Sequence, residues 1–185
     1  MLTCELSAAR HAVQSGGVIA YPTEAVFGLG CNPADLAAVQ RILTLKQRAA
    51  DKGLILIAAD LSQLEAYLLP LDAILQARVL PTWPGAVTWL LPVRPAVSPL
   101  IRGKHDTLAV RITAHPICRA LCQQLGHPLI STSANVSDHP PARSAAAVQQ
   151  QFGAQLDAIL DAPVGDQAQP SEIRHGITGE IVRPA

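Results

Sequence analysis

Hydrophobic residues recur along this chain in two alternating patterns. Apolar residues three or four positions apart, as at Leu36, Val39 and Leu43, are typical of a helix with one buried face. Short unbroken apolar runs, as over 54–58, predict strands buried on both faces. Helices are predicted over 3–14, 33–46, 60–68, 71–80, 116–125 and 144–152. Strands are predicted over 18–21, 54–58, 86–91, 108–112, 129–131 and 156–160, with short strands over 170–174 and 180–183. This alternation favours one layered α/β (mixed α+β) domain over residues 1–185, with a mixed sheet.

Glycine, proline and capping residues mark the ends of several elements. Gly16 and Gly17 end the first predicted helix. Asn32 followed by Pro33 is the expected start of the second helix. The segment 22–30 begins with a proline and contains two glycines, so we expect a loop there.

The composition is that of a compact protein with a large core. Hydrophobic residues make up 49% of the 185 residues and charged residues only 15%, which excludes an intrinsically disordered chain. Basic and acidic residues number 14 each, so no overall field attracts nucleic acid or an anionic membrane. No apolar run approaches the ~18 residues of a membrane span and no leader peptide is evident, so we expect a soluble cytoplasmic protein.

Four cysteines raise the question of a metal site. Cys4, Cys31, Cys118 and Cys122 show neither CxxC pairing nor zinc-ribbon spacing. Small buried hydrophobic residues in a reducing compartment are the favoured interpretation, and no metal site is predicted.

Polar residues gather where two predicted elements end. The segment 131–135 follows an apolar strand with hydroxyl and amide groups, at the edge where open α/β sheets usually bind ligands. Lys46, Arg48 and Lys52 lie before another strand, with Asp51 as the only acid among them, and lysine with arginine suits phosphate oxygens. The alternative for 131–135 is an ordinary polar turn, and the alternative for the segment with Lys46 is a solvated charged loop.

One arginine lies inside an apolar run. Arg111, near the end of the strand over 108–112, needs an anionic partner, which can be a substrate or a buried acid. Neither a P-loop nor a Rossmann glycine motif occurs, so those phosphate cradles are not available.

These motifs have the order of one known family. They are Tyr21-Pro22-Thr23-Glu24 with Gly28-Leu29-Gly30, Lys46-Gln47-Arg48, Pro84-Gly85 with Thr88, Arg111, Ser131-Thr132-Ser133-Ala134-Asn135 and Pro170-Ser171. From about residue 16 to the end, the chain resembles the YrdC-type threonylcarbamoyl-AMP synthases, in their short form without a second C-terminal domain. The resemblance implies a YrdC-like fold, with a twisted, mostly open mixed sheet flanked by helices around a concave, locally basic cavity.

The resemblance also implies an activity. The family condenses L-threonine, bicarbonate and ATP, which is accompanied by Mg²⁺, into L-threonylcarbamoyladenylate, pyrophosphate and water. This nucleotidyltransferase reaction is the first step of threonylcarbamoyladenosine modification of tRNA. Downstream threonylcarbamoyl-transferase proteins and tRNA are implied as indirect partners, with weak direct RNA binding as a further option.

The family's site residues fall on definite positions of this chain. The implied catalytic and ATP-binding residues are Lys46, Arg48, Ser133 and Asn135, with Arg183 near the nucleotide. The implied threonine-binding residues are Thr23, Arg111, Ser131 and Ser171. The reaction needs such groups because every species in it is anionic, so positioning and charge neutralisation can carry it without a strong nucleophile.

The chain departs from the family at three positions, and two other functions stay open. The family often has proline at the position of Ala86, threonine at that of Glu172 and glycine at that of Asp138. One alternative is a non-catalytic module for double-stranded RNA, although zero net charge and few aromatic residues count against it. The other is a related carbamoyl-adenylate enzyme with a different amine or carbamoyl donor.

Overall fold

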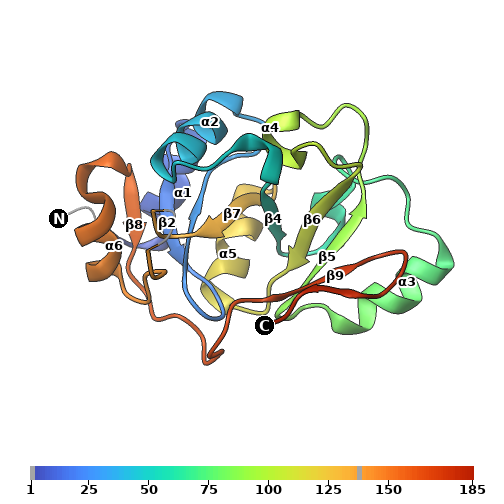
Figure 1. The fold of residues 1–185 in the computed structure, drawn as a ribbon. Helices are drawn as coiled ribbons and strands as arrows, with labels where there is room; N and C mark the ends of the chain where they lie inside the picture. The colour runs from blue at the N-terminus through green and yellow to red at the C-terminus, as the bar shows by residue number, and fades with distance from the viewer. Residues whose placement is uncertain (1–2, 137–138) are drawn as a thin grey trace.

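The structure is a computed structural model that describes residues 3–136 and 139–185 (Figure 1). Within these residues, ten strands form one mixed sheet in the order β1-β8-β2-β3-β7-β4-β6-β5-β9-β10. The strands are β1 (Thr3–Cys4), β2 (Ile19–Pro22), β3 (Phe27–Gly30), β4 (Ile55–Ala58), β5 (Val87–Pro92), β6 (Thr107–Ile112), β7 (Leu129–Ser133), β8 (Ala158–Leu160), β9 (Glu172–His175) and β10 (Ile181–Arg183). The helices are α1 (Leu6–Gln14), α2 (Leu36–Leu45), α3 (Ala73–Val79), α4 (Pro99–Arg102), α5 (Pro116–Leu125) and α6 (Ala145–Phe152). Short 3-10 turns are η1 (Ala50–Lys52), η2 (Leu61–Leu64), η3 (Leu80–Thr82) and η4 (Gly153–Gln155). The predicted mixed sheet flanked by helices is confirmed.

One face of the sheet is covered by the larger hydrophobic core. Leu56 of β4, Val110 of β6 and Ile130 of β7 are fully buried in it. Helices α2 and α6 contribute Ile42 and Val148 to the same core. These helices lie over the sheet because their apolar residues recur on one face, as the sequence pattern predicted.

The opposite face is covered only in part. Ile57 of β4 and Leu129 of β7 pack with Leu121 of α5 in a smaller core, to which α1 also contributes. Residues two apart on a strand share a face, but Ile55, two positions before Ile57, lines a cavity together with Ala109 of β6. The cavity therefore occupies the part of this face that α1 and α5 leave open.

Two strands were not predicted. The helix expected over 3–14 begins only at Leu6, because Thr3–Cys4 form an edge strand paired with the distant β8. The loop expected over 22–30 contains β3, which forms a hairpin with β2 and also pairs with β7. Neither strand has a local signal, because one is two residues long and the other alternates apolar residues with glycine.

Two predicted helices have different bounds in the structure. The second helix starts at Leu36, after Asp35 rather than Asn32, because the Asp35 carboxylate accepts hydrogen bonds from the amides of Ala37 and Ala38 at 3.0 and 3.1 Å. The helix expected over 60–68 is only the 3-10 turn η2.

The cysteines lie apart from the cavity. All four are free thiols, and Cys31, Cys118 and Cys122 are buried among apolar side chains. Within the described ranges, no cluster of three or more His, Cys, Asp or Glu side chains could hold a metal ion. None of the helices placed by the structure has both the length and the apolar character needed to cross a membrane.

The packing around Gly30 gives a first test of the fold. A Cβ at Gly30 would lie 2.5 Å from the Ile130 carbonyl oxygen and 2.6 Å from Tyr21 Cε1. Gly30→Ala should therefore lower the free energy of unfolding by about 1–3 kcal/mol, the usual cost of overpacking a core. Gly28→Ala, on the same strand, is the control, because its Cβ would meet only ordinary contacts at 3.4–3.5 Å. Urea denaturation of both variants measures the difference, and equal stability would contradict this packing.

Candidate active site

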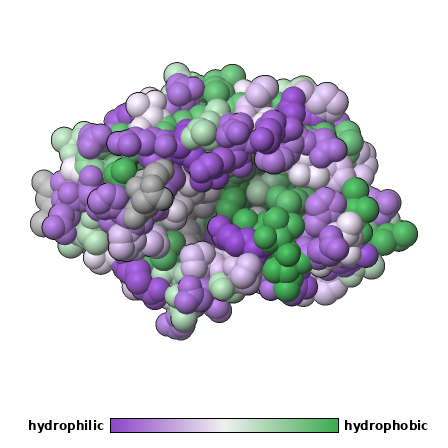
Figure 2. Space-filling view, in the orientation of Figure 1, coloured by the Kyte–Doolittle hydropathy of each residue, from purple (hydrophilic) through white to green (hydrophobic). Residues whose placement is uncertain are grey.

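A cavity of about 430 Å³ opens on the partly covered face of the sheet, within the size range of small-molecule sites. The space-filling view shows a hollow with hydrophobic atoms inside it and hydrophilic residues along its upper rim (Figure 2). Neighbouring strands provide its apolar lining, which includes Ile55, Leu90, Ala109 and Ile173. The cavity thus combines an apolar surface with a polar margin.

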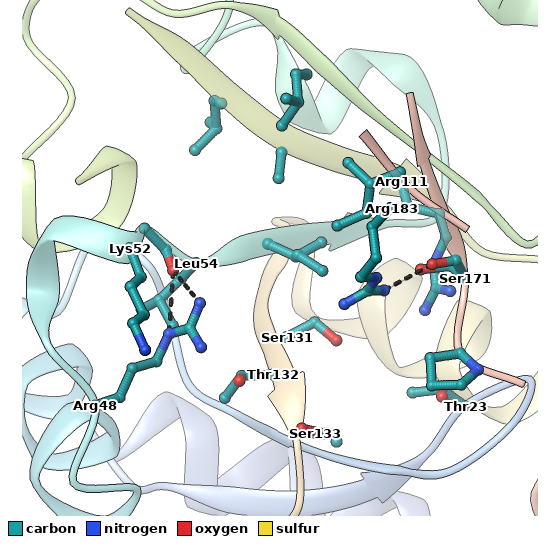
Figure 3. A pocket seen from close by; sticks show the side chains of 18 of the residues that line it. Thr23, Arg48, Lys52, Leu54, Arg111, Ser131, Thr132, Ser133, Ser171 and Arg183 are labelled. Atoms are coloured by element: carbon teal, nitrogen blue, oxygen red, sulfur yellow. Dashed lines mark hydrogen bonds between the residues drawn. The ribbon is translucent and has the colours of Figure 1, made fainter. Parts of the chain in front are cut away.

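The polar residues of the cavity form two groups with β7 between them. Arg48 and Lys52 lie on one side, and Ser171 and Arg183 lie on the other (Figure 3). The hydroxyl groups of 131–133 lie between the two groups (Figure 3). The arrangement can hold two anionic groups side by side, with hydrogen-bonding groups between them.

The structure gives Lys46 and Arg48 different environments. Gln47, between them, has a φ of 51°, a left-handed conformation that is uncommon for a residue other than glycine. Arg48 lines the cavity, with its Nε and Nη2 donating to the carbonyl oxygen of Gly53 at 3.3 and 3.0 Å. Lys46 is only 3% exposed and is not among the described residues that line the cavity.

The buried ammonium group of Lys46 holds the segment after β7. Its Nζ donates to the carbonyl oxygens of Ser133 and Asn135 at 2.5 and 2.8 Å, and to Oδ1 of Asn135 at 3.3 Å. Ser133 and Asn135 themselves line the cavity. Burial, together with the charge of Arg48, lowers the pKa of Lys46 to about 8.

The second polar group is built from the β2–β3 turn and the C-terminal hairpin. The Thr23 hydroxyl donates to the Val26 carbonyl at 2.7 Å, which fixes the turn. The hydroxyls of Ser171 and Thr88 are 2.9 Å apart, and Nη2 of Arg183 donates to the Ser171 carbonyl at 2.6 Å. Thr23, Ser171 and Arg183 all line the cavity, as does Ser131.

Arg111 lines the cavity and also pairs with a buried acid. Its Nη2 lies 3.2 Å from Oε2 of Glu24, and the two side chains are only 7% and 10% exposed. From the sequence, a substrate and a buried acid were alternatives for the partner of Arg111, whereas this position allows both. Burial alone would raise the pKa of Glu24, but the Arg111 charge and the hydrogen bond from Thr113 outweigh it and hold that pKa below its ordinary value.

The cavity is strongly basic, as the resemblance implied. Its described lining contains no carboxylate, and its cationic and imidazole side chains are Arg48, Lys52, Arg102, Arg111, Arg183 and His105. Burial, and next the charges of Arg111 and Arg48, lower the pKa of Arg183. Anions would relieve this repulsion on binding.

Eight of the nine site residues that the resemblance implied line the cavity, all except Lys46, but the described lining also contains residues that the sequence did not single out. Arg102 and His105 had no motif, because they follow a proline-rich stretch and reach the cavity only through the tertiary fold. Neither Ala86 nor Glu172, two departures from the family, is among the described lining residues. The third departure, Asp138, lies outside the described residues.

Comparison with known proteins identifies the family. A family model for Sua5, YciO and YrdC proteins, described as "Telomere recombination", matches residues 11–185. The chain belongs to this family. The threonylcarbamoyl-AMP synthase of Nitrosococcus oceani is 57% identical over 175 residues, covering 95% of each chain. The corresponding synthase of Idiomarina loihiensis is 54% identical over 178 residues, again 95% of each chain.

Solved structures of the Sua5, YciO and YrdC family have the same fold. The crystal structure of P. abyssi Sua5 complexed with L-threonine has a TM-score of 0.86 and 34% identity, over 92% of this chain. The matched region is 50% of that Sua5 chain, so the present chain spans about half of its length. These findings confirm the resemblance seen in the motifs.

The buried position of Lys46 predicts how stability depends on pH. Its pKa is about 8 in the folded protein against 10.5 ordinarily, so between these values the unfolded chain binds more protons at this residue. The contribution of Lys46 to the free energy of unfolding should then rise with pH across this window. The free energy of unfolding of the wild type minus that of Lys46→Met should increase by on the order of 2 kcal/mol from pH 7.5 to 10. Urea denaturation measures it, with the exposed Lys104→Met as control, and a flat or falling difference would contradict the assignment.

Proposed function

We propose that this protein is a threonylcarbamoyl-AMP synthase. It would convert L-threonine, bicarbonate and ATP into L-threonylcarbamoyladenylate, pyrophosphate and water. Membership in the Sua5, YciO and YrdC family and 57% identity to a synthase of that name support the proposal. We further propose that residues 1–185 act as a single YrdC-like domain.

The observation that carries the proposal is the division of the cavity into two cationic groups. Arg111 and Arg183 lie with hydroxyl-bearing residues at one group, and Arg48 and Lys52 lie at the other. An amino acid carboxylate and a triphosphate are anions that could occupy these groups at the same time. The hydroxyls of β7 lie between them, where the reacting atoms would meet.

In this proposal the residues around Arg111, here called the threonine group of the cavity, bind threonine and aim its amine as the nucleophile. Arg111 grips the carboxylate of threonine, because a guanidinium can make two parallel hydrogen bonds to it. Thr23, Ser131 and Ser171 surround the rest of the amino acid. The amine combines with bicarbonate to give an N-carboxylate and water. An oxygen of this N-carboxylate then bonds to the α-phosphorus of ATP as the bond from that phosphorus to the pyrophosphate oxygen breaks.

The other group would hold and neutralise the phosphates. Arg48 contacts phosphate oxygens, and Lys46 acts by fixing the segment that carries Ser133 and Asn135. Arg183, which belongs to the group that contains Arg111, would contact the nucleotide from that side. Such fixed charges stabilise the transition state because they need no reorganisation as pyrophosphate leaves.

Magnesium would enter as part of the substrate. The described lining of the cavity has no carboxylate, so the phosphate oxygens of ATP rather than protein acids would supply its anionic ligands. We propose a cytoplasmic location, with threonylcarbamoyl-transferase proteins as the consumers of the adenylate and tRNA as an indirect partner. Any direct RNA contact would be weak, because basic and acidic residues balance at 14 each.

The reaction itself can be tested with the purified protein. Incubation with ATP, L-threonine and bicarbonate should release pyrophosphate and give an acyl adenylate detectable by mass spectrometry, without tRNA. Omission of threonine or bicarbonate should abolish both signals. No release of pyrophosphate would favour the non-catalytic RNA-binding module, and release that proceeds equally with another amine would favour the related carbamoyl-adenylate enzyme. Release that requires tRNA would also contradict the proposal.

A substitution tests the phosphate-binding side of the cavity separately. Arg48→Ala should lower turnover about a hundredfold, which corresponds to ~2.7 kcal/mol of lost charge stabilisation. Lys104→Ala is the matched control, because the Lys104 side chain is 73% exposed and pairs only loosely with Asp51 at 3.7 Å. Steady-state kinetics would show the contrast. Near-normal turnover of a folded Arg48→Ala protein would contradict a role in phosphate binding and favour the alternative, a solvated charged loop.

A further inference from the structure

Glu24 lies directly behind the threonine group of the cavity. It belongs to the turn between β2 and β3 and is 8% exposed, and it is not among the described lining residues, although its neighbour Thr23 is. One carboxylate oxygen, Oε1, accepts hydrogen bonds from the Thr113 hydroxyl at 2.7 Å and the Ala114 amide at 3.1 Å. Both donors follow β6, the strand that carries Arg111, so the acid is fixed to the same element as the arginine.

The backbone of Glu24 is fixed from the other side as well. The amide of Gly165 donates to the Thr23 carbonyl at 2.9 Å, and that of Gln167 donates to the Glu24 carbonyl at 3.1 Å. A Cβ at Gly165 would lie 2.8 Å from the Glu24 carbonyl oxygen, so the two segments are in close contact. The carboxylate is therefore held in one position before any substrate binds.

The second oxygen of Glu24 faces Arg111, and the pair is incompletely bonded. Oε2 of Glu24 and Nη2 of Arg111 are 3.2 Å apart, but neither Oε2 nor the Arg111 Nε, both buried, has a hydrogen-bond partner. Among the described residues, no protein group accepts a hydrogen bond from Arg111. Arginine has five N–H donors, and a buried guanidinium that leaves them unused is costly unless a ligand completes the set.

We propose that Glu24 is a positioning residue that aims the Arg111 guanidinium at the carboxylate of the amino acid substrate. The inference rests on the proposed function. Glu24 faces the guanidinium through Nη2 and leaves the remaining accessible donors for the substrate. It does not touch the substrate itself and acts only through Arg111.

The contact between Glu24 and Arg111 has a second effect, because several positive charges lie close together in the cavity. Arg48, Arg111 and Arg183 line one cavity that has no carboxylate in its described lining, and the phosphates of ATP attract all three. A fixed anion behind Arg111 holds this arginine at the threonine group and offsets its repulsion with the other two. Loss of the anion should therefore weaken threonine binding more than ATP binding.

Glu24→Gln tests the proposal, because the amide keeps an oxygen for Thr113 and Ala114 but loses the charge opposite Arg111. We expect the KM for threonine to rise at least tenfold, kcat to fall, and the KM for ATP to stay within twofold. Glu24→Asp is the second variant, which keeps the charge but is one methylene too short to reach Thr113 and Arg111 together. It should raise the threonine KM about three- to tenfold, and it keeps the test available if Glu24→Gln does not fold.

A double-mutant cycle separates positioning from general support of the fold. If Glu24 acts through Arg111, the double variant Glu24→Gln/Arg111→Lys should have a kcat/KM for threonine within twofold of Arg111→Lys alone. Multiplying effects, or equal changes in the KM for threonine and ATP, would overturn the proposal. So would an unchanged threonine KM in either folded Glu24 variant. A wild-type protein that makes no threonine-dependent adenylate would instead overturn the proposed function, so the two failures are distinguishable.

Discussion

The fold leaves part of one sheet face without a covering helix, and the candidate site depends on that open part. Along β4 the same face passes from Ile57, packed under α5, to Ile55, which lines the cavity. An apolar surface left open in this way favours the binding of a ligand that covers it. The polar residues that surround it come from strand ends and turns, which is where binding residues are most often found on a rigid sheet.

The second constraint is electrostatic, because the cavity concentrates positive charge in a protein of zero formal net charge. Several of these positive side chains are held in place by an oxygen atom of the protein itself. Arg48 is bonded to the Gly53 carbonyl and Arg183 to the Ser171 carbonyl, while Arg111 faces Glu24. Lys46, outside the described lining, is bonded to the Ser133 carbonyl. Cations held in this way repel one another in the empty protein, which costs stability. They need little reorganisation when anions bind, and this is the usual basis of electrostatic catalysis.

Much of the fold followed from local sequence signals. The apolar runs of β4 and β6 predicted buried strands, and the period of α5, with its stop at Gly126, predicted a helix of the observed length. By contrast, β1 and β3 depend on pairing with strands far away in the chain, and no local pattern marks them. Long-range pairing is therefore where prediction of the strands failed.

The candidate site shows the same division. The ordered motifs predicted which residues gather, and of the nine site residues that the resemblance implied only Lys46 is absent from the described lining. Lys46 is buried although Arg48, two positions later, lines the cavity, and no local sequence signal marks the left-handed backbone of Gln47 between them. Nor could the sequence pair Glu24 with Arg111, because 87 positions separate them and only the sheet brings them together.

A crystal structure of the protein with L-threonine bound tests the roles of Arg111 and Glu24 most directly. We expect the threonine carboxylate to lie within hydrogen-bond distance of the Arg111 guanidinium, while Glu24 remains against the opposite edge of that group. The amine should point toward the side of the cavity that carries Arg48. Threonine bound elsewhere, or bound in the cavity with Arg111 turned away from its carboxylate, would contradict the role of Arg111 in binding threonine.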